Sequence, residues 1–250
     1  MLRDLLGSPA PGAPRQGHWP TQCELCRQWT AGDALCPGCD TRFASLRARC
    51  TRCALPTGTP VHRCGGCLGA QEPPFDATVA AADYGFPWDS LVQAFKFHGR
   101  VELAPLLADR LARAVAASAP PATLPAPTLV LPVPLAPARL AERGYNQAWE
   151  LARRVARLRG LPADDALLLR PIDTPHQTGQ SRAGREANLA RSFMAEPRQR
   201  AALAGRAVAL VDDVMTTGAT VAAAAQELRR AGATAVHVWV FARTPAPGSA

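Results

Sequence analysis

The chain has 250 residues, of which 48% are apolar and 19% charged, and its formal net charge is +8. This length suits one well-buried domain with a small appendage, and the composition is ordinary for a globular protein. No apolar run approaches the roughly 20 residues that span a bilayer, and residues 1–20 lack the apolar stretch of a signal peptide. We therefore expect a cytoplasmic protein without membrane insertion.

All eight cysteines lie between residues 23 and 67, in four Cys-x₂-Cys pairs. Each pair presents two thiolates to one ion, and two pairs complete the tetrahedron of a structural zinc site. Because four thiolates leave no open coordination position, we expect two structural Zn²⁺ ions. Iron–sulfur or redox chemistry and disulfides are the alternatives, and the spacing does not exclude interleaved pairing. The expected ligands are Cys23, Cys26, Cys36, Cys39, Cys50, Cys53, Cys64 and Cys67.

The positive charge is weak evidence for nucleic-acid binding. Eight thiolates and two zinc ions would lower the net charge from +8 to about +4. Arginines inside the cysteine region nevertheless keep binding of single-stranded DNA or protein open as an alternative. We expect the Gly- and Pro-rich residues 1–20 to be disordered and residues 21–72 to form a double zinc-ribbon module.

Residues 73–250 follow an alternating α/β pattern, which predicts a mostly parallel sheet flanked by helices. Four prolines predict a loop at 118–128. Strands are expected at 78–84, 129–133, 207–211 and 235–241, with a short apolar run at 166–169. Helices are expected at 89–97, 101–117, 146–159 and 220–231.

The sharpest motif joins the strand at 207–211 to the helix at 220–231. Two carboxylates end the strand, and a loop of small residues leads into the helix. The backbone N–H groups of such a loop and of the helix N-terminus bind an anion. Two carboxylates beside an anion site are expected if the ligand also has hydroxyl groups that donate to them, as a phosphorylated sugar does. An ordinary acidic turn without a ligand is the alternative. The segment reads Val208-Ala-Leu-Val-Asp212-Asp213-Val214-Met215-Thr216-Thr217-Gly218-Ala219-Thr220.

This segment resembles the 5-phosphoribosyl 1-pyrophosphate (PRPP) motif of type I phosphoribosyltransferases. By that resemblance, residues 212–220 bind PRPP together with Mg²⁺. Asp212 and Asp213 would contact the ribose hydroxyls, and the segment from Thr216 to Thr220 would hold the 5′-phosphate. The resemblance also implies a pyrophosphate loop after the first core strand. Arg139 and Arg143 lie there four residues apart, although a solvated basic helix start is the alternative.

The polar stretch 173–190 is long for a loop without secondary structure. In phosphoribosyltransferases a flexible hood loop at this position closes over the site and excludes water. By resemblance, its functional members are Thr174, Gln177, Arg185 and Asn188.

Three segments narrow the resemblance to the ComF family, which is associated with DNA uptake in competent bacteria. They are Phe95-Lys96-Phe97-His98-Gly99, Arg143-Gly-Tyr-Asn-Gln147, and the spaced set Thr174, Gln177, Arg185, Asn188 and Phe193. The resemblance covers nearly all of residues 23–242. It implies a type I phosphoribosyltransferase fold with a hood at 73–128 and a core at 129–242. Ala219 departs from the glycine that many transferases have there.

Lys96 is the only lysine among 28 basic residues. A compact ammonium differs chemically from a guanidinium, so its survival in an arginine-rich chain points to a specific requirement. By resemblance the hood lies over the acceptor and the pyrophosphate. We therefore expect Lys96 in the site, with Phe95 or Phe97 anchoring its helix; chance survival is the alternative.

Two functions fit these motifs. The first is an enzyme that transfers a 5-phosphoribosyl group from PRPP to an acceptor the sequence does not identify, with Mg²⁺ and release of pyrophosphate. Its candidate catalytic residues are Asp212, Asp213 and Lys96. The second is a non-catalytic PRPP-sensing or adaptor protein whose zinc module binds a DNA-uptake helicase or single-stranded DNA. The sequence favours the enzyme and leaves a homodimer open.

Overall fold

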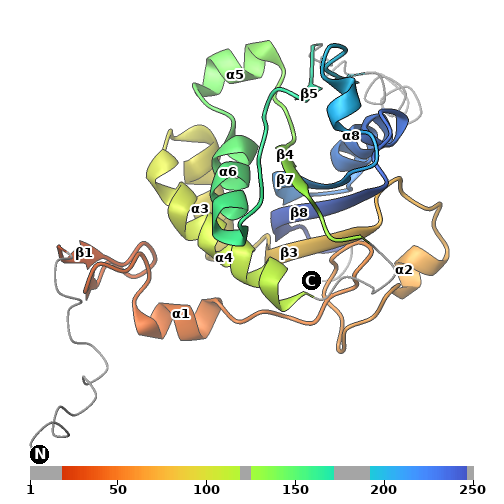
Figure 1. Cartoon of the computed structure of the whole chain (residues 1–250). Helices are drawn as coiled ribbons and strands as arrows, with labels where there is room; N and C mark the ends of the chain where they lie inside the picture. Colours follow the sequence, from red (N-terminus) through yellow and green to blue (C-terminus); the bar gives the residue numbers. More distant parts are fainter. Residues whose placement is uncertain (1–18, 119–124, 172–191, 247–250) are drawn as a thin grey trace, which may run out of the picture. The chain divides into compact units, whose positions relative to one another are not determined.

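The computed structural model describes residues 19–118, 125–171 and 192–246 (Figure 1). The chain divides into two compact units, Met1–Ser45 and Leu46–Ala250. The second half of the cysteine region falls in the larger unit. The zinc-ribbon module at 21–72 and the division of the rest into hood and core stay predictions, and the disorder expected for residues 1–20 falls almost entirely outside the described residues.

The smaller unit holds a short hairpin followed by a helix. Strand β1 (Thr21–Gln22) pairs antiparallel with β2 (Trp29–Thr30), and helix α1 spans Pro37–Phe43. Helix α1 begins at Cys36, whose sulfur accepts a hydrogen bond from the Cys39 N–H at 3.4 Å. Pro37 is favourable at the first helical position, because that residue needs no hydrogen-bond donor there.

The larger unit is built on a four-stranded parallel sheet in the order β3-β8-β7-β4. Its strands are β3 (Ala77–Asp83), β4 (Leu129–Pro132), β7 (Ala207–Met215) and β8 (Ala235–Arg243). Strand β8 is buried at every position, as expected for a parallel strand covered on both faces. The α/β class is confirmed. Because the strands are parallel, their carboxyl ends meet at one edge of the sheet.

Helices cover both faces of this sheet. Helices α4 (Ala104–Ala117) and α6 (Gln147–Arg159) lie on one face, and α8 (Ala219–Arg230) lies on the other (Figure 1). Helix α3 (Trp88–Phe97) follows β3, the 3₁₀ turn η1 (Val101–Leu103) leads into α4, and α5 (Pro137–Arg143) follows β4. The remaining elements are α2 (Gly65–Leu68), β5 (Leu168–Leu169), β6 (Met194–Ala195) and the 3₁₀ turn η2 (Arg200–Ala202), with β5 and β6 pairing antiparallel.

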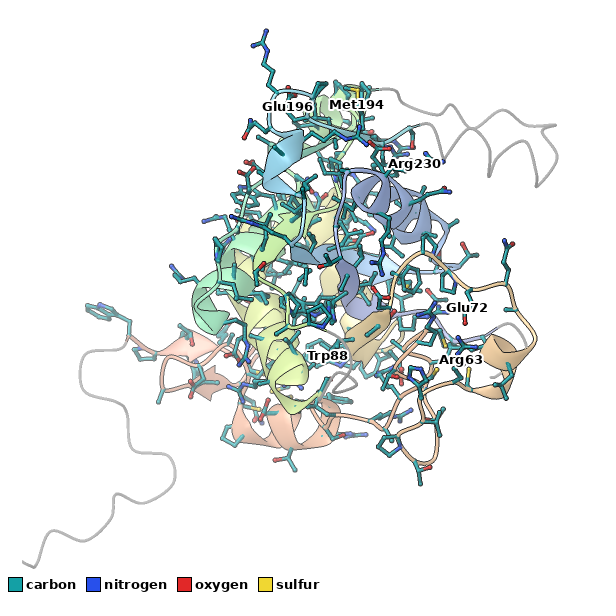
Figure 2. All side chains as sticks on the ribbon, turned by 45° about the vertical axis from the view of Figure 1, so that its right-hand side comes forward. Arg63, Glu72, Trp88, Met194, Glu196 and Arg230 are labelled. Atoms are coloured by element: carbon teal, nitrogen blue, oxygen red, sulfur yellow. The ribbon has the colours of Figure 1, made fainter. Side chains whose placement is uncertain are left out.

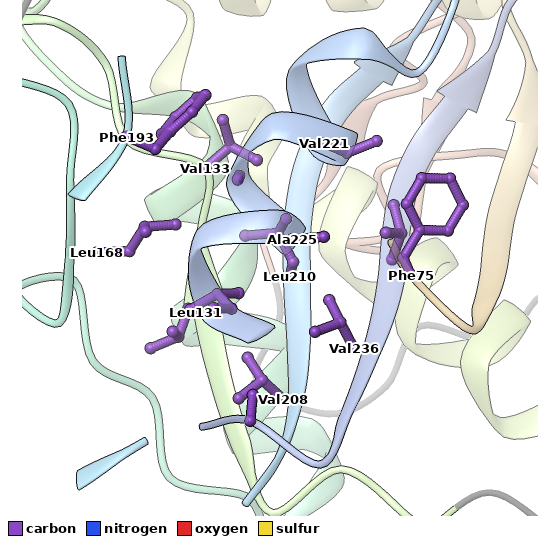
Figure 3. Packing of buried hydrophobic residues seen from close by; sticks show 14 of the residues in the cluster. Phe75, Leu131, Val133, Leu168, Phe193, Val208, Leu210, Val221, Ala225 and Val236 are labelled. Carbon is purple, nitrogen blue, oxygen red and sulfur yellow. The ribbon is translucent and has the colours of Figure 1, made fainter. Parts of the chain in front are cut away.

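Aliphatic side chains fill the space between the sheet and α8. Leu131, Leu210 and Val236 come from three neighbouring strands and pack with Ala225 of α8 (Figure 3). All of these side chains are fully buried. Small alanines on α8 let its axis approach the sheet closely, and this approach fixes where the helix begins at the sheet edge. Among the described residues, no helix is long and apolar enough to cross a membrane; the cytoplasmic location stays a prediction.

The second cysteine segment packs on the sheet, which explains the boundary at Ser45. The Thr78 N–H donates to Thr51 O at 2.7 Å, and the Thr78 hydroxyl donates to Arg52 O at 2.8 Å. Ala54 is fully buried within the same core cluster as the sheet residues. Arg63 and Glu72 form an ion pair that ties the end of this segment to its linker (Figure 2). Residues 46–72 are therefore part of the larger unit.

Candidate functional site

Two acids lie within the last four residues of β7. The sequence predicted that this strand ends at residue 211, but it continues to Met215. The extension exists because Asp212, Val214 and Met215 pair in parallel register with Val240, Ala242 and Arg243 of β8. Asp212 and Asp213 are thus held by the sheet ladder and placed at its carboxyl edge. Open α/β sheets bind their ligands at this edge.

The chain turns tightly from β7 into α8. Gly218 has a φ of +86°, a left-handed conformation that a residue with a side chain rarely adopts. A Cβ atom at this position would lie 2.8 Å from the Met215 Cε, so Met215 packs directly under the turn. The segment Thr216–Thr220 therefore leads directly into the N-terminus of α8, where helix N–H groups and the helix dipole favour an anion.

Lys96 reaches this edge from a distant part of the chain. It lies near the end of α3, and its Nζ donates to the Asp213 Oδ1 at 2.8 Å. The side chain of Asp213 is 6% exposed and that of Lys96 is 22% exposed. The structure thus brings together Lys96 and one acid of the motif, two residues that are 117 positions apart.

Phe95 is the aromatic residue that anchors α3. It is fully buried, its ring packs on that of Tyr145 with centroids 5.7 Å apart, and its carbonyl accepts a hydrogen bond from the Tyr145 hydroxyl. Phe97 is instead 63% exposed, and the Arg143 guanidinium lies over its ring at 5.2 Å. The end of α3 is therefore fixed on one side by the core, and on its exposed side Phe97 contacts Arg143 of α5.

The two adjacent carboxyl groups differ in their surroundings. The Asp213 N–H donates to the Asp212 Oδ1 at 2.9 Å, whereas Lys96 pairs with the Asp213 carboxylate. Desolvation, together with the negative charge of Asp213, raises the pKa of Asp212 to about 7, although Lys96 opposes this shift. A carboxyl group with this pKa exchanges a proton near neutral pH, which suits a general base.

Arg139 and Arg143 both lie on α5, one turn apart and partly buried. Arg143 also donates to the Gln147 Oε1 at 3.1 Å, and Gln147 is almost fully buried at the start of α6. Arg143 is thus close to the end of α3, while convergence of both arginines on a pyrophosphate stays a prediction. The expected hood residues Thr174, Gln177, Arg185 and Asn188 lie outside the described residues.

The cysteines form two separate clusters in chain order, Cys23/Cys26/Cys36/Cys39 and Cys50/Cys53/Cys64/Cys67. In each cluster the four sulfur atoms lie within 4.8 Å of one another. The Sγ–Sγ distances are 3.6 Å for Cys26–Cys36, 3.6 Å for Cys53–Cys64 and 3.9 Å for Cys50–Cys67. A tetrahedral Zn–S₄ site with Zn–S bonds of about 2.3 Å has sulfur atoms about 3.8 Å apart, whereas a disulfide brings them to about 2.05 Å. The clusters therefore fit metal ions.

The thiols within each cluster interact electrostatically. Desolvation and the neighbouring sulfur atoms raise the pKa of Cys39 to about 12. Desolvation also raises the pKa of Cys53 in the second cluster. Four thiolates at such distances repel one another unless a cation lies between them. Each cluster could hold one zinc ion.

Comparison with known proteins identifies the family. Residues 177–249 match the phosphoribosyl transferase domain. The DNA utilization protein YhgH of Salmonella typhi is 36% identical over 228 residues, which cover 90% of this chain and 98% of that protein. Competence protein F of Haemophilus influenzae is 34% identical over 224 residues, which cover 89% and 96%. The chain belongs to the ComF family.

This ComF protein has a type I phosphoribosyltransferase fold with N-terminal cysteine clusters compatible with zinc ribbons. Solved structures with some likeness include the Bacillus subtilis glutamine PRPP amidotransferase, at a TM-score of 0.39 and 21% identity over 60% of this chain and 30% of that one. The adenine phosphoribosyltransferase of Leishmania tarentolae has a TM-score of 0.31 and 18% identity over 58% of both chains. Likenesses of this size say nothing about the substrate.

Two residues near the site, Tyr145 and Arg243, were not predicted from the sequence. Tyr145 lies in one of the segments that carry the family resemblance, but its contact with the Phe95 carbonyl joins α3 to the turn between α5 and α6 and has no periodic signal. Arg243 ends β8 and is 7% exposed. A charged residue that closes an apolar strand is the signal that could have singled it out, because buried arginines need several acceptors.

The raised pKa of Asp212 predicts how stability depends on pH. An aspartate in an unfolded chain ionises near pH 4, so ionisation of Asp212 at a higher pKa destabilises the fold progressively as pH rises toward about 7. Asp212→Asn keeps an acceptor for the Asp213 N–H but cannot ionise. Relative to the parent, the melting temperature of this variant should rise between about pH 5.5 and 7.5 and level off at higher pH.

Thermal unfolding followed by circular dichroism checks this expectation. Keeping the pH above about 5.5 preserves the cysteine ligands of any bound metal. Asp165→Asn, at an exposed aspartate, is the control and should show a constant difference from the parent. A constant difference for Asp212→Asn as well would contradict the raised pKa.

Proposed function

We propose that this ComF protein binds PRPP and Mg²⁺ at the carboxyl edge of its sheet and transfers the 5-phosphoribosyl group to an acceptor, releasing pyrophosphate. The observation that carries the proposal is the Asp212–Asp213 pair. These acids lie within the last four residues of a parallel strand, shortly before the turn at Gly218, and Asp213 pairs with Lys96. A ligand that has both a diol and a phosphate can donate hydrogen bonds to the two carboxylates and at the same time bind the N–H groups of the turn.

In this proposal the two acids bind the sugar and the turn binds the phosphate. Carboxylate oxygens of Asp212 and Asp213 accept hydrogen bonds from the ribose 2′- and 3′-hydroxyls. Backbone N–H groups and hydroxyls of the segment Thr216–Thr220, with the N-terminus of α8, hold the 5′-phosphate. Mg²⁺ bound with PRPP would neutralise part of the pyrophosphate charge.

The transfer step breaks the C1–O bond to pyrophosphate and forms a bond from the acceptor nucleophile to C1. Pyrophosphate leaves with the electron pair of the broken bond, and Asp212, with its pKa near 7, takes the proton of the acceptor. The ribose hydroxyls compete with Lys96 for the Asp213 carboxylate. Lys96 then directs its charge at the pyrophosphate or the acceptor, and Arg143 adds charge from α5.

A second candidate function is DNA binding by the smaller unit, with or without turnover. Two tryptophans of this unit, Trp19 and Trp29, are 88% and 71% exposed. Exposed aromatic rings stack with unpaired bases in proteins that bind single-stranded nucleic acid. The names of the relatives, DNA utilization protein and competence protein, agree with this candidate. A DNA-uptake helicase as the partner of this unit, and a homodimer, remain proposals without a contact that favours them.

The first prediction from this proposal concerns PRPP binding. The double variant Asp212→Asn, Asp213→Asn should bind PRPP with Mg²⁺ about a hundredfold more weakly than the parent, because it loses charged acceptors for the diol. Isothermal calorimetry measures the affinity, and Asp165→Asn is the control, expected to bind like the parent. Pyrophosphate release across a panel of bases, amines and cell extract then tests turnover. Equal affinity of the double variant and the parent would rule out this site for PRPP.

The second prediction concerns Lys96. Its Nζ lies 2.8 Å from the Asp213 Oδ1, at the end of a helix that Phe95 fixes in the core. A longer, planar guanidinium does not fit the same geometry, so Lys96→Arg should weaken PRPP binding or turnover by about tenfold at unchanged melting temperature. Arg100→Lys, the reverse exchange four residues away, should change neither. A Lys96→Arg variant with parental affinity and turnover would mean that charge alone matters at this position.

The third prediction concerns zinc. We propose that both cysteine clusters hold structural zinc, so purified protein should contain about two Zn²⁺ per chain by elemental analysis. Cys36→Ser removes one ligand from the first cluster and should lower the zinc content toward about one per chain. Because this cluster lies in the smaller unit, PRPP affinity should remain parental. Iron in place of zinc, or absence of metal, would contradict the proposal.

A further inference from the structure

Arg243 joins the second cysteine cluster to the start of the turn after β7. It is the last residue of β8, and its Nε donates to the carbonyl oxygen of Cys53 at 2.9 Å. From the same guanidinium, Nη1 donates to Met215 O at 3.1 Å and also to Thr216 O. One buried side chain therefore holds a carbonyl of a metal-ligand residue and two carbonyls of the segment that leads into the turn.

The segment that carries these carbonyls is closely packed. Thr244 N–H donates to Met215 O at 3.0 Å, next to the Arg243 bond to the same oxygen. The Met215 side chain lies directly under Gly218, where even an added Cβ would meet it at 2.8 Å. The segment that Arg243 binds therefore packs directly against the turn at Gly218.

Further contacts fix the backbone of residues 49–54, which includes Cys53. Arg49 donates to Ala54 O at 2.9 Å and pairs with the Asp83 Oδ1 at 2.8 Å. Asp83 is the register partner of Arg243 across the β3–β8 ladder. Residues 49–54 are thus attached to the carboxyl edge of two neighbouring strands, immediately beside the link to Met215.

The second cluster also links two segments of the chain. A metal ion bound there would cross-link the Cys50–Cys53 pair to the Cys64–Cys67 pair, and its loss would release the two pairs from each other.

We propose that Arg243 is a positioning residue that makes the conformation of the turn Thr216–Gly218 depend on metal bound at Cys50, Cys53, Cys64 and Cys67. With metal bound, the cluster holds the Cys53 carbonyl, Arg243 holds Met215 and Thr216, and the turn is fixed. Without metal, the Cys53 carbonyl moves and the turn loosens. The first cluster lies in the other compact unit. The consequence for PRPP affinity rests on the proposed function, but the consequence for the turn does not.

The experiment compares two pairs of matched variants in the full-length protein. Cys64→Ser and Cys36→Ser each remove the cysteine that begins the short helix of its cluster, α2 or α1. Arg243→Lys keeps the charge but loses the fork that reaches Cys53 and Met215 together. Its control is Arg229→Lys, because Arg229 donates to Ala233 O and Thr234 O and pairs with Asp76 at the opposite edge of the same sheet.

Hydrogen–deuterium exchange is measured on peptides that cover residues 213–222 and 242–246. Cys64→Ser and Arg243→Lys should each speed exchange in these peptides about tenfold, because the loss of one or two hydrogen bonds shifts local opening by that factor. Cys36→Ser and Arg229→Lys should leave these peptides unchanged. Exchange at the parental rate in Arg243→Lys, or equal acceleration by the controls, would overturn the inference. Arg243→Lys keeps the cluster intact, so the positioning of the turn by Arg243 is tested even if Cys64→Ser fails to fold.

Calorimetry with PRPP and Mg²⁺ separates this inference from the proposed function. If the parent binds PRPP, Cys64→Ser and Arg243→Lys should bind it about tenfold more weakly, while both controls bind like the parent. If the parent does not bind PRPP, the proposed function is wrong, and the exchange measurement still decides whether the cluster positions the turn.

Discussion

The parallel pairing of β7 with β8 is the constraint on which the rest of the larger unit depends. Its register sets Asp212 opposite Val240 and Met215 opposite Arg243. Two acids and the start of the turn therefore occupy fixed positions at one edge of the sheet, with a buried arginine beside them. Since the side-chain period of a strand is two residues, a slip of one residue would exchange the faces of Asp212 and Asp213. The apolar burial of both strands makes such a slip costly.

Adjacent acids on a packed strand place two like charges close together. A cationic side chain pairs with only one of them. Lys96 pairs with Asp213, which leaves Asp212 with a backbone N–H donor and a raised pKa. The two aspartates therefore differ in their ion pairing: Asp213 pairs with Lys96, whereas Asp212 has a raised pKa. Local conflicts that a fold leaves partly unresolved are typical of functional sites, because a ligand can satisfy what the protein does not.

The sequence predicted most elements of the larger unit within a few residues, since its strands and helices have strong apolar periodicity. It also singled out Lys96, because Lys96 is the only lysine and the resemblance places its segment in the hood. It ended β7 too early, because aspartate is disfavoured in strands and only the long-range pairing with β8 overrides that preference. The Asp213 partner of Lys96 was likewise invisible, because a contact across 117 residues is fixed by the fold and has no local signal.

The cysteine region shows a second property that local sequence does not reveal. Its four Cys-x₂-Cys pairs follow one another at similar intervals, and nothing in the spacing distinguishes the first cluster from the second. The distinction comes from residues outside the cysteine pattern: Thr78 of β3 and Arg243 of β8 bind the backbone of the second cluster. Two cysteine clusters of nearly identical spacing thus have different surroundings. The first lies in the smaller unit, whereas the second is part of the structure around the sheet edge. Ligand spacing predicts which ion a site can hold, but the neighbours of the ligands determine what that ion stabilises.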